Sequence, residues 1–140
     1  MSGISKDVEK AWSAAVAARQ NAHAPYSGFQ VGAAVKLQGV DEPVAGCNVE
    51  NASFGATLCA ERVAITQGVA RHGRRRPEFV VVVTDENQAT VPCGLCLQVL
   101  AEFAPDDLPV HLANLKGVQK TMLLRELLPH AFRSFGVSTP

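Results

Sequence analysis

The stretch "EFVVVVTD" at residues 78–85 contains four consecutive valines and decides the fold class. A run of β-branched residues without a polar face is typical of a strand that is covered on both faces. The segments on either side of it alternate between helix and strand patterns. Because strands and helices alternate along the chain, we predict a three-layer α/β/α sandwich with a mixed five-stranded sheet.

The other elements follow from local signals. Ser5 can cap a first helix, and Gly32, inside an apolar run, predicts a strand approached closely by another backbone. The expected strands are residues 29–37, 44–49, 78–85, 109–114 and 117–122, and the expected helices are residues 5–21, 58–72, 93–103 and 123–128. With 140 residues, 47% of them hydrophobic, and no linker, residues 1–140 are expected to form a single domain.

Charge and hydropathy exclude several function classes. Thirteen basic and thirteen acidic residues give a net charge of zero, which argues against sequence-independent binding of nucleic acid. No apolar run reaches the roughly 18 residues of a membrane span, and the N-terminus lacks an apolar signal segment. We therefore expect a cytoplasmic protein without a nucleic-acid or membrane partner. The basic stretch "RHGRRRP" (71–77) is expected to be a solvated helix end, with a phosphate or RNA contact as the alternative.

Four cysteines carry the chemistry. They are Cys47, Cys59, Cys93 and Cys96, and in a chain without an export signal they favour metal binding or catalysis over disulfides. The segment "PCGLC" (92–96) places two thiols in the first turn of a helix, where the helix dipole favours thiolates. The pair alone is compatible with half of a structural zinc site, with a redox-active pair, or with part of a catalytic zinc site.

Cys59 favours the catalytic zinc site. It also lies at a predicted helix start, and helix starts meet at the carboxyl ends of strands, where ligands bind in α/β sheets. Catalytic zinc sites have three protein ligands and a water, whereas structural sites have four protein ligands. A fourth ligand from Cys47 or from a histidine would make the site structural. Cys47 lies in an apolar strand, so we expect an inert buried thiol.

Glu61 supplies a group that a catalytic site needs. It follows Cys59 by two residues, so it could reach the open zinc position without binding the metal. A carboxylate there can take a proton from water and return it to a leaving group, and zinc lowers the pKa of a bound water to about 7. Taken alone, Glu61 would be a solvated helix carboxylate.

These motifs resemble a known family. "CAER" and "PCGLC" are similar to the paired zinc motifs of nucleoside and nucleobase deaminases. A longer series resembles the small homotetrameric zinc-dependent cytidine deaminases: "APYSGFQVGAAV" (24–35), "GCNVENASFG" (46–55), "CAER" (59–62), "PCGLCLQVL" (92–100) and "ELLPHAF" (126–132). The pieces span most of the chain in the order of the family, and the combination is specific although each piece alone is weak.

The resemblance implies a role for each motif residue. The implied zinc ligands are Cys59, Cys93 and Cys96, with Glu61 as the proton shuttle and Arg62 as a partner of the ligand sulfurs. The implied substrate contacts are the backbone N–H of Ala60 to the pyrimidine carbonyl, Phe29 on the base, Asn48 and Glu50 on the ribose 3′-hydroxyl, and Phe132 in the pocket of a neighbouring subunit. Without the resemblance, Phe29 would be an ordinary core aromatic at a strand start, Phe132 would be buried at a subunit contact, and Asn48 and Glu50 would be polar caps of a loop.

The implied reaction is hydrolytic deamination of cytidine or deoxycytidine to uridine or deoxyuridine and ammonia, with Zn²⁺ as cofactor, a small nucleoside as substrate and a homotetramer as the assembly. The alternative within the enzymes is a deaminase of a modified cytosine nucleoside such as blasticidin S. An enzyme that edits polynucleotides fits the neutral charge less well. Outside catalysis by zinc, the alternatives are a structural zinc module and a thioredoxin-like redox pair.

Two residues depart from the family pattern. Leu97 stands where the family commonly has arginine, and Phe54 stands where tyrosine is expected. Three thiolates give a zinc ion a net charge of −1, which opposes ionisation of its water unless cations offset it. Arg62 is then the remaining cation of the motif. We expect the substitution Leu97→Arg to change the pH–rate profile.

Overall fold

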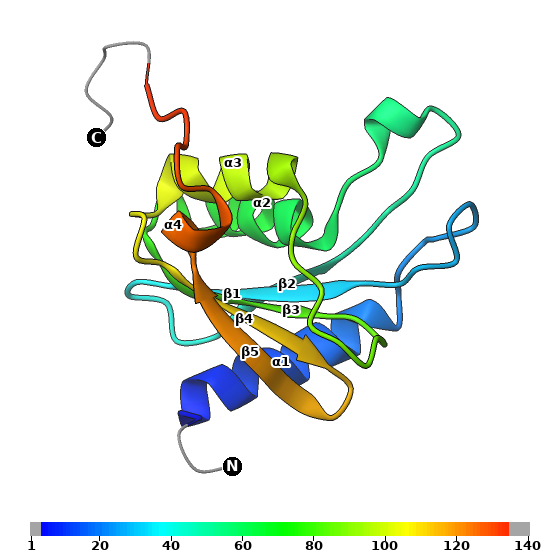
Figure 1. Ribbon diagram of the computed structural model, residues 1–140, viewed down its shortest axis with the longest axis horizontal. Helices are drawn as coiled ribbons and strands as arrows, with labels where there is room; N and C mark the ends of the chain where they lie inside the picture. Colours follow the sequence, from blue (N-terminus) through cyan, green and yellow to red (C-terminus); the bar gives the residue numbers. More distant parts are fainter. Residues whose placement is uncertain (1–3, 135–140) are drawn as a thin grey trace.

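The computed structural model describes residues 4–134 and has a five-stranded sheet between layers of helices (Figure 1). The strands are β1 Gly32–Leu37, β2 Val44–Cys47, β3 Pro77–Val83, β4 Pro109–Asn114 and β5 Gly117–Leu123. The helices are α1 Lys6–Arg19, α2 Ala60–His72, α3 Gly94–Phe103 and α4 Leu124–Leu127, with a 3₁₀ turn, η1, at Phe54–Ala56.

The sheet has the strand order β2-β1-β3-β4-β5, so the valine-rich β3 is its central strand. The β3–β4 pair is parallel, and the β2–β1, β1–β3 and β4–β5 pairs are antiparallel. A mixed five-stranded sheet between helices confirms the predicted fold class. The predicted hairpin of the first two strands is present as well.

Alternate valines of β3 point to opposite faces of the sheet, as the two-residue period of a strand requires. Val81 and Val83 pack in a cluster with residues of α1, including Ala11. Val80 and Val82 pack in a second cluster with residues of α3. Burial on both faces explains why this strand needs no polar residue between Phe79 and Val83.

Helix α1 lies directly against the sheet. Its N-cap Ser5 accepts a hydrogen bond from the Val8 backbone N–H at 3.2 Å, as predicted. A Cβ atom at Gly32 would lie 2.0 Å from the carbonyl oxygen of Ala15. The strand therefore needs glycine at this position, which confirms the expected close approach of a second backbone.

Strand β1 begins at Gly32, three residues later than predicted. In the preceding segment the Val31 carbonyl still accepts the Asn48 backbone N–H at 3.3 Å, but the Asn48 side-chain amide takes the other bonds, accepting from the Val31 N–H and donating to the Phe29 carbonyl. The segment is consequently free to line a cavity. Within residues 4–134, no helix combines the length and apolar character needed to cross a bilayer.

Candidate active site

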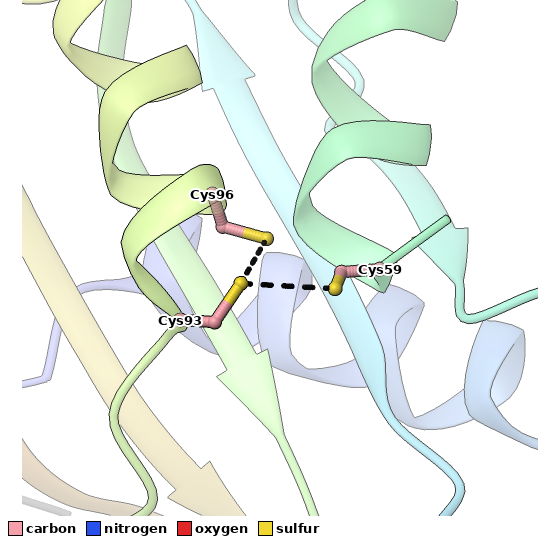
Figure 2. Close-up of side chains that lie close together, drawn as sticks. All are labelled: Cys59, Cys93 and Cys96. Atoms are coloured by element: carbon pink, nitrogen blue, oxygen red, sulfur yellow. Dashed lines mark hydrogen bonds between the residues drawn. The ribbon is translucent and has the colours of Figure 1, made fainter. Parts of the chain in front are cut away.

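The first turns of α2 and α3 lie side by side and bring three thiols together (Figure 2). Cys59 is the N-cap of α2, Cys93 is the N-cap of α3, and Cys96 lies in the first turn of α3. The Sγ atoms of Cys59 and Cys93 are 3.9 Å apart, and those of Cys93 and Cys96 are 3.5 Å apart. All three sulfurs lie within 4.8 Å of one another, so the two motifs form one cluster.

The cluster fits a zinc ion. Thiolates at about 2.3 Å from a tetrahedral zinc lie about 3.8 Å from one another, close to the two sulfur separations. Within the described part of the chain the group has three members, and Cys47 is not one of them. Three thiolates leave the fourth tetrahedral position for water or substrate, as in catalytic sites. Cys47 is half-buried, and burial raises the pKa of its thiol.

Arg62 supplies positive charge beside the thiols. Its Nη2 donates hydrogen bonds to the Cys59 sulfur and to the carbonyl of Thr57, both at 3.3 Å. A hydrogen bond from the Cys96 thiol, together with Arg62, lowers the pKa of Cys59 to about 5 against the opposing effect of burial. The same hydrogen bond and burial raise the pKa of Cys96. The cluster thus holds one thiolate readily, and a divalent cation would allow further ionisation with release of protons.

Glu61 is 5% exposed and lines the same cavity as Cys59 and Cys93. Burial raises the pKa of its carboxyl above the ordinary value. A raised pKa brings the protonated and ionised forms of the carboxyl closer in energy at neutral pH, which suits a group that must both accept and donate a proton. The sequence predicted that the Glu61 carboxylate reaches the open coordination position of the metal. In the structure Glu61 is buried and lines the cavity beside the thiols.

The cavity has a volume of about 270 Å³. Besides Cys59, Cys93 and Glu61, its wall includes four of the predicted substrate contacts: Phe29, Asn48, Glu50 and Ala60. Ala60 opens α2, where backbone N–H groups have no partner inside the helix. Two of the clustered thiols, a buried carboxyl, a helix-start backbone donor and an aromatic ring therefore surround one space.

Comparison with known proteins agrees with this arrangement. A family model described as the cytidine and deoxycytidylate deaminase zinc-binding region matches residues 5–112. The chain belongs to this deaminase family. The matched region contains all three clustered cysteines, and zinc is the cofactor that they fit.

Individual relatives cover most of the chain. A cytidine deaminase of Halalkalibacterium halodurans is 45% identical over 84% of this chain and 88% of its own. The crystal structure of cytidine deaminase from Burkholderia pseudomallei superposes with a TM-score of 0.83 at 38% identity, and the match covers 92% of this chain and all of that one. A blasticidin-S deaminase of Bacillus cereus is more distant, at 30% identity over 71% of this chain and 74% of its own.

Phe132 does not line the cavity of its own chain. Its side chain is 56% exposed, and its carbonyl accepts a hydrogen bond of 2.6 Å from Gln98 Nε2. Phe54, one of the two departures from the deaminase pattern, is 73% exposed and lies edge-on to Tyr26 with ring centroids 5.6 Å apart. Both phenylalanines thus present apolar surface to the outside.

Leu97, the other departure from the deaminase pattern, is a core residue. It is 5% exposed and packs with Val80 and Leu100 between α3 and the sheet. Replacing Leu97 with arginine would therefore change the packing of the core as well as the charge beside the thiols. Any arginine at this position would have to leave the core or bury its charge there.

Four polar residues of the cavity wall were not predicted from the sequence: Ser27, Thr57, Thr84 and Thr90. Ser27 lies within the motif "APYSGFQVGAAV", so the motif itself was a usable signal. Thr84 directly follows the valine run and is 2% exposed, and its hydroxyl lies 3.4 Å from that of Thr90. Thr84 and Thr90 come together at the cavity wall only in the folded chain, so no local sequence pattern indicates their position.

The basic stretch at residues 71–77 contacts the carbonyl ends of α2 and α3. Arg75 Nε donates to the carbonyl of His72 at 3.2 Å. The Arg74 guanidinium lies 5.9 Å from the ring centroid of Phe103, and its Nη2 donates to the Glu102 carbonyl at 3.4 Å. These bonds favour the expected helix-end role, since cations stabilise the carbonyl end of a helix.

Proposed function

We propose that the protein is a zinc-dependent cytidine deaminase that hydrolyses cytidine or deoxycytidine to uridine or deoxyuridine and ammonia. One observation carries the proposal: in a member of the deaminase family, a cluster of three thiols adjoins a cavity that Cys59, Cys93 and the buried Glu61 line together. A structural zinc module would need neither the open fourth position nor the carboxyl.

Cys59, Cys93 and Cys96 would hold the metal, and zinc when bound lowers the pKa of a water molecule toward about 7. Arg62 offsets part of the thiolate charge through its bond to Cys59. Without that cation, three thiolates would leave the site with more negative charge and would oppose ionisation of the water.

Glu61 moves the protons of the reaction. It takes a proton from the water that adds to C4 of cytosine and delivers it to N3. It then carries the second proton of that water to the amino nitrogen, the C4–N bond breaks, and ammonia leaves with uridine as the product. A carboxyl whose pKa is raised by burial serves in both directions, because its protonated and ionised forms are closer in energy near neutral pH.

Four residues of the cavity wall would hold the nucleoside. The free N–H of Ala60 donates to the pyrimidine carbonyl, and the ring of Phe29 packs on the base. Asn48 and Glu50 bond to the 3′-hydroxyl, which is both a donor and an acceptor and so suits an amide and a carboxylate together.

The test is an ultraviolet assay of cytidine, deoxycytidine, 5-methylcytidine and blasticidin S, combined with metal analysis of the purified protein. We expect one zinc per chain and turnover of cytidine and deoxycytidine. Turnover of blasticidin S in their place would assign the modified nucleoside as substrate. One zinc per chain with no turnover of any of the four would favour a structural module, and a metal-free protein that cycles a Cys93–Cys96 disulfide would favour a redox pair.

The proposal includes the assembly and the compartment. We propose a homotetramer in which Phe132 completes the pocket of a neighbouring subunit, supported by the exposed apolar side chains of Phe54 and Phe132. Residues 1–140 would form one domain, and the cytoplasm would keep the three thiols reduced. Light scattering tests the tetramer. The substitution Phe132→Ala should weaken cytidine turnover in every subunit if the ring completes a neighbour's pocket.

A further inference from the structure

Side chains supply several of the hydrogen bonds that hold the segment at residues 26–31, just before β1. The Phe29 N–H donates to Ser27 Oγ at 3.0 Å, and the Phe29 carbonyl accepts from Asn48 Nδ2 at 2.8 Å. The Val31 N–H donates to Asn48 Oδ1 at 2.8 Å. The position of the Phe29 ring in the cavity therefore depends on the side chains of Ser27 and Asn48.

Ser27 also bonds to the Glu50 carboxylate. Its hydroxyl donates to Glu50 Oε2, and Oε1 accepts the N–H groups of Tyr26 at 2.9 Å and of Ser27 at 3.1 Å. A carboxylate has about four lone-pair sites, and three of them are occupied by these donors. The remaining site is on Oε2, the oxygen that Ser27 holds.

The direction of these bonds is fixed. Because Ser27 Oγ accepts the Phe29 N–H, its single proton is the one that reaches Glu50. The bonds form a chain from the Phe29 N–H through the Ser27 hydroxyl to the Glu50 carboxylate, and such chains strengthen their members. Phe29 and Glu50, which would hold the base and the sugar, are thus connected through one hydroxyl.

We propose that Ser27 is a positioning residue of the nucleoside pocket: its hydroxyl holds the Phe29 ring and the Glu50 carboxylate in a fixed relation and leaves one lone pair of Oε2 for a donating sugar hydroxyl. This inference rests on the proposed function and deepens it. The sugar hydroxyl must donate because an ionised carboxylate only accepts. The pocket would therefore select nucleosides with a free 3′-hydroxyl.

The charge of Glu50 agrees with this role. Its pKa lies below the ordinary value, chiefly because the Ser27 hydroxyl bonds to it, with help from the N–H groups of Ser27 and Tyr26 and from the charge of His23, and against desolvation. Removing the Ser27 hydroxyl should raise the pKa of Glu50. His23 lies beside Glu50, whose backbone N–H donates to the His23 carbonyl at 2.8 Å.

The test compares Ser27→Ala and Ser27→Thr with a matched control, Ser13→Ala, on the exposed side of α1. We expect Ser27→Ala to lower kcat/KM for cytidine about tenfold, mainly through KM, since loss of a hydrogen bond to a charged group is of that order. On 3′-deoxycytidine the loss should be about twofold or less. Ser27→Thr keeps the hydroxyl and should restore most of the activity, and Ser13→Ala should match the wild type.

A second measurement does not require turnover. The carboxyl carbon of Glu50 is titrated by NMR in the zinc-loaded protein, and its pKa should be higher in Ser27→Ala than in the wild type and in Ser27→Thr. Equal losses on cytidine and 3′-deoxycytidine, or an unchanged pKa of Glu50, would overturn the proposal. A wild type that fails to turn over cytidine, together with a raised pKa in Ser27→Ala, would refute the proposed function and leave the Ser27–Glu50 link intact.

Discussion

Arg62 should control how tightly the thiol cluster binds zinc. Its Nη2 lies 3.3 Å from the Cys59 sulfur, and two unit charges at that distance attract by about 5 kcal/mol at an effective dielectric constant of about 20. Solvent screening and the cost of desolvation reduce this, and hydrogen bonds to charged groups contribute about 1.5–3 kcal/mol net. The substitution Arg62→Ala should therefore weaken zinc binding by about 10- to 100-fold.

The assay is a competition titration with a chelating dye at neutral pH. Arg62→Lys keeps the charge and loses the planar pair of donors, so its affinity should lie between those of the wild type and Arg62→Ala. Arg71→Ala, an exposed position in the last turn of α2, is the matched control for loss of one positive charge. Arg62→Ala with wild-type zinc affinity, or with a loss no greater than that of Arg71→Ala, would refute the charge argument.

Three further substitutions test the fold and the core. Gly32→Ala should destabilise the protein by about 3 kcal/mol or more in urea unfolding, because the new Cβ meets the backbone of Ala15 2.0 Å away. Gly55→Ala is the control, because a Cβ there has nothing within 4 Å. Equal stabilities of the two variants would contradict the close approach of α1 to Gly32. Leu97→Arg should lower stability by about 3–5 kcal/mol, because it places an unpaired charge in the core. A shifted pH–rate profile at unchanged stability would show instead that the arginine reaches the thiols. Burial lowers the pKa of His111 below its ordinary 6.5. The unfolded state therefore binds more protons than the folded state, and the free energy of unfolding falls as the pH falls below about 6.5. His111→Gln should remove this part of the pH dependence of stability, and identical stability–pH profiles of the two proteins would exclude a contribution from His111.

The sequence predicted the architecture because the strongest signals are local. Four valines without a polar face indicate a central strand, and Ser5 marks the start of α1. The start of β1 was predicted too early because Phe29 and Val31 continue the apolar pattern of the strand yet bond to the side chain of Asn48. No property of the segment itself reveals a partner that lies just beyond the end of β2.

The site was predictable in outline for a different reason. The two motifs start helices, and the fold of an α/β sheet brings such starts together, so the thiol cluster follows from topology. The burial of Leu97 and the bond from Ser27 to Glu50 depend on packing between distant segments. The sequence therefore indicated which residues carry the chemistry, and it left open what holds them in place.

Turnover by the zinc-loaded protein and its Glu61→Gln variant tests the central claim most directly. Both proteins should contain one zinc per chain, because Glu61 is not a member of the thiol group. The wild type should convert cytidine to uridine with release of ammonia, and Glu61→Gln should be slower by at least about 10²- to 10⁴-fold, the usual contribution of a general acid–base group. A zinc-loaded wild type that deaminates neither cytidine nor deoxycytidine, or a Glu61→Gln variant as active as the wild type, would contradict the account.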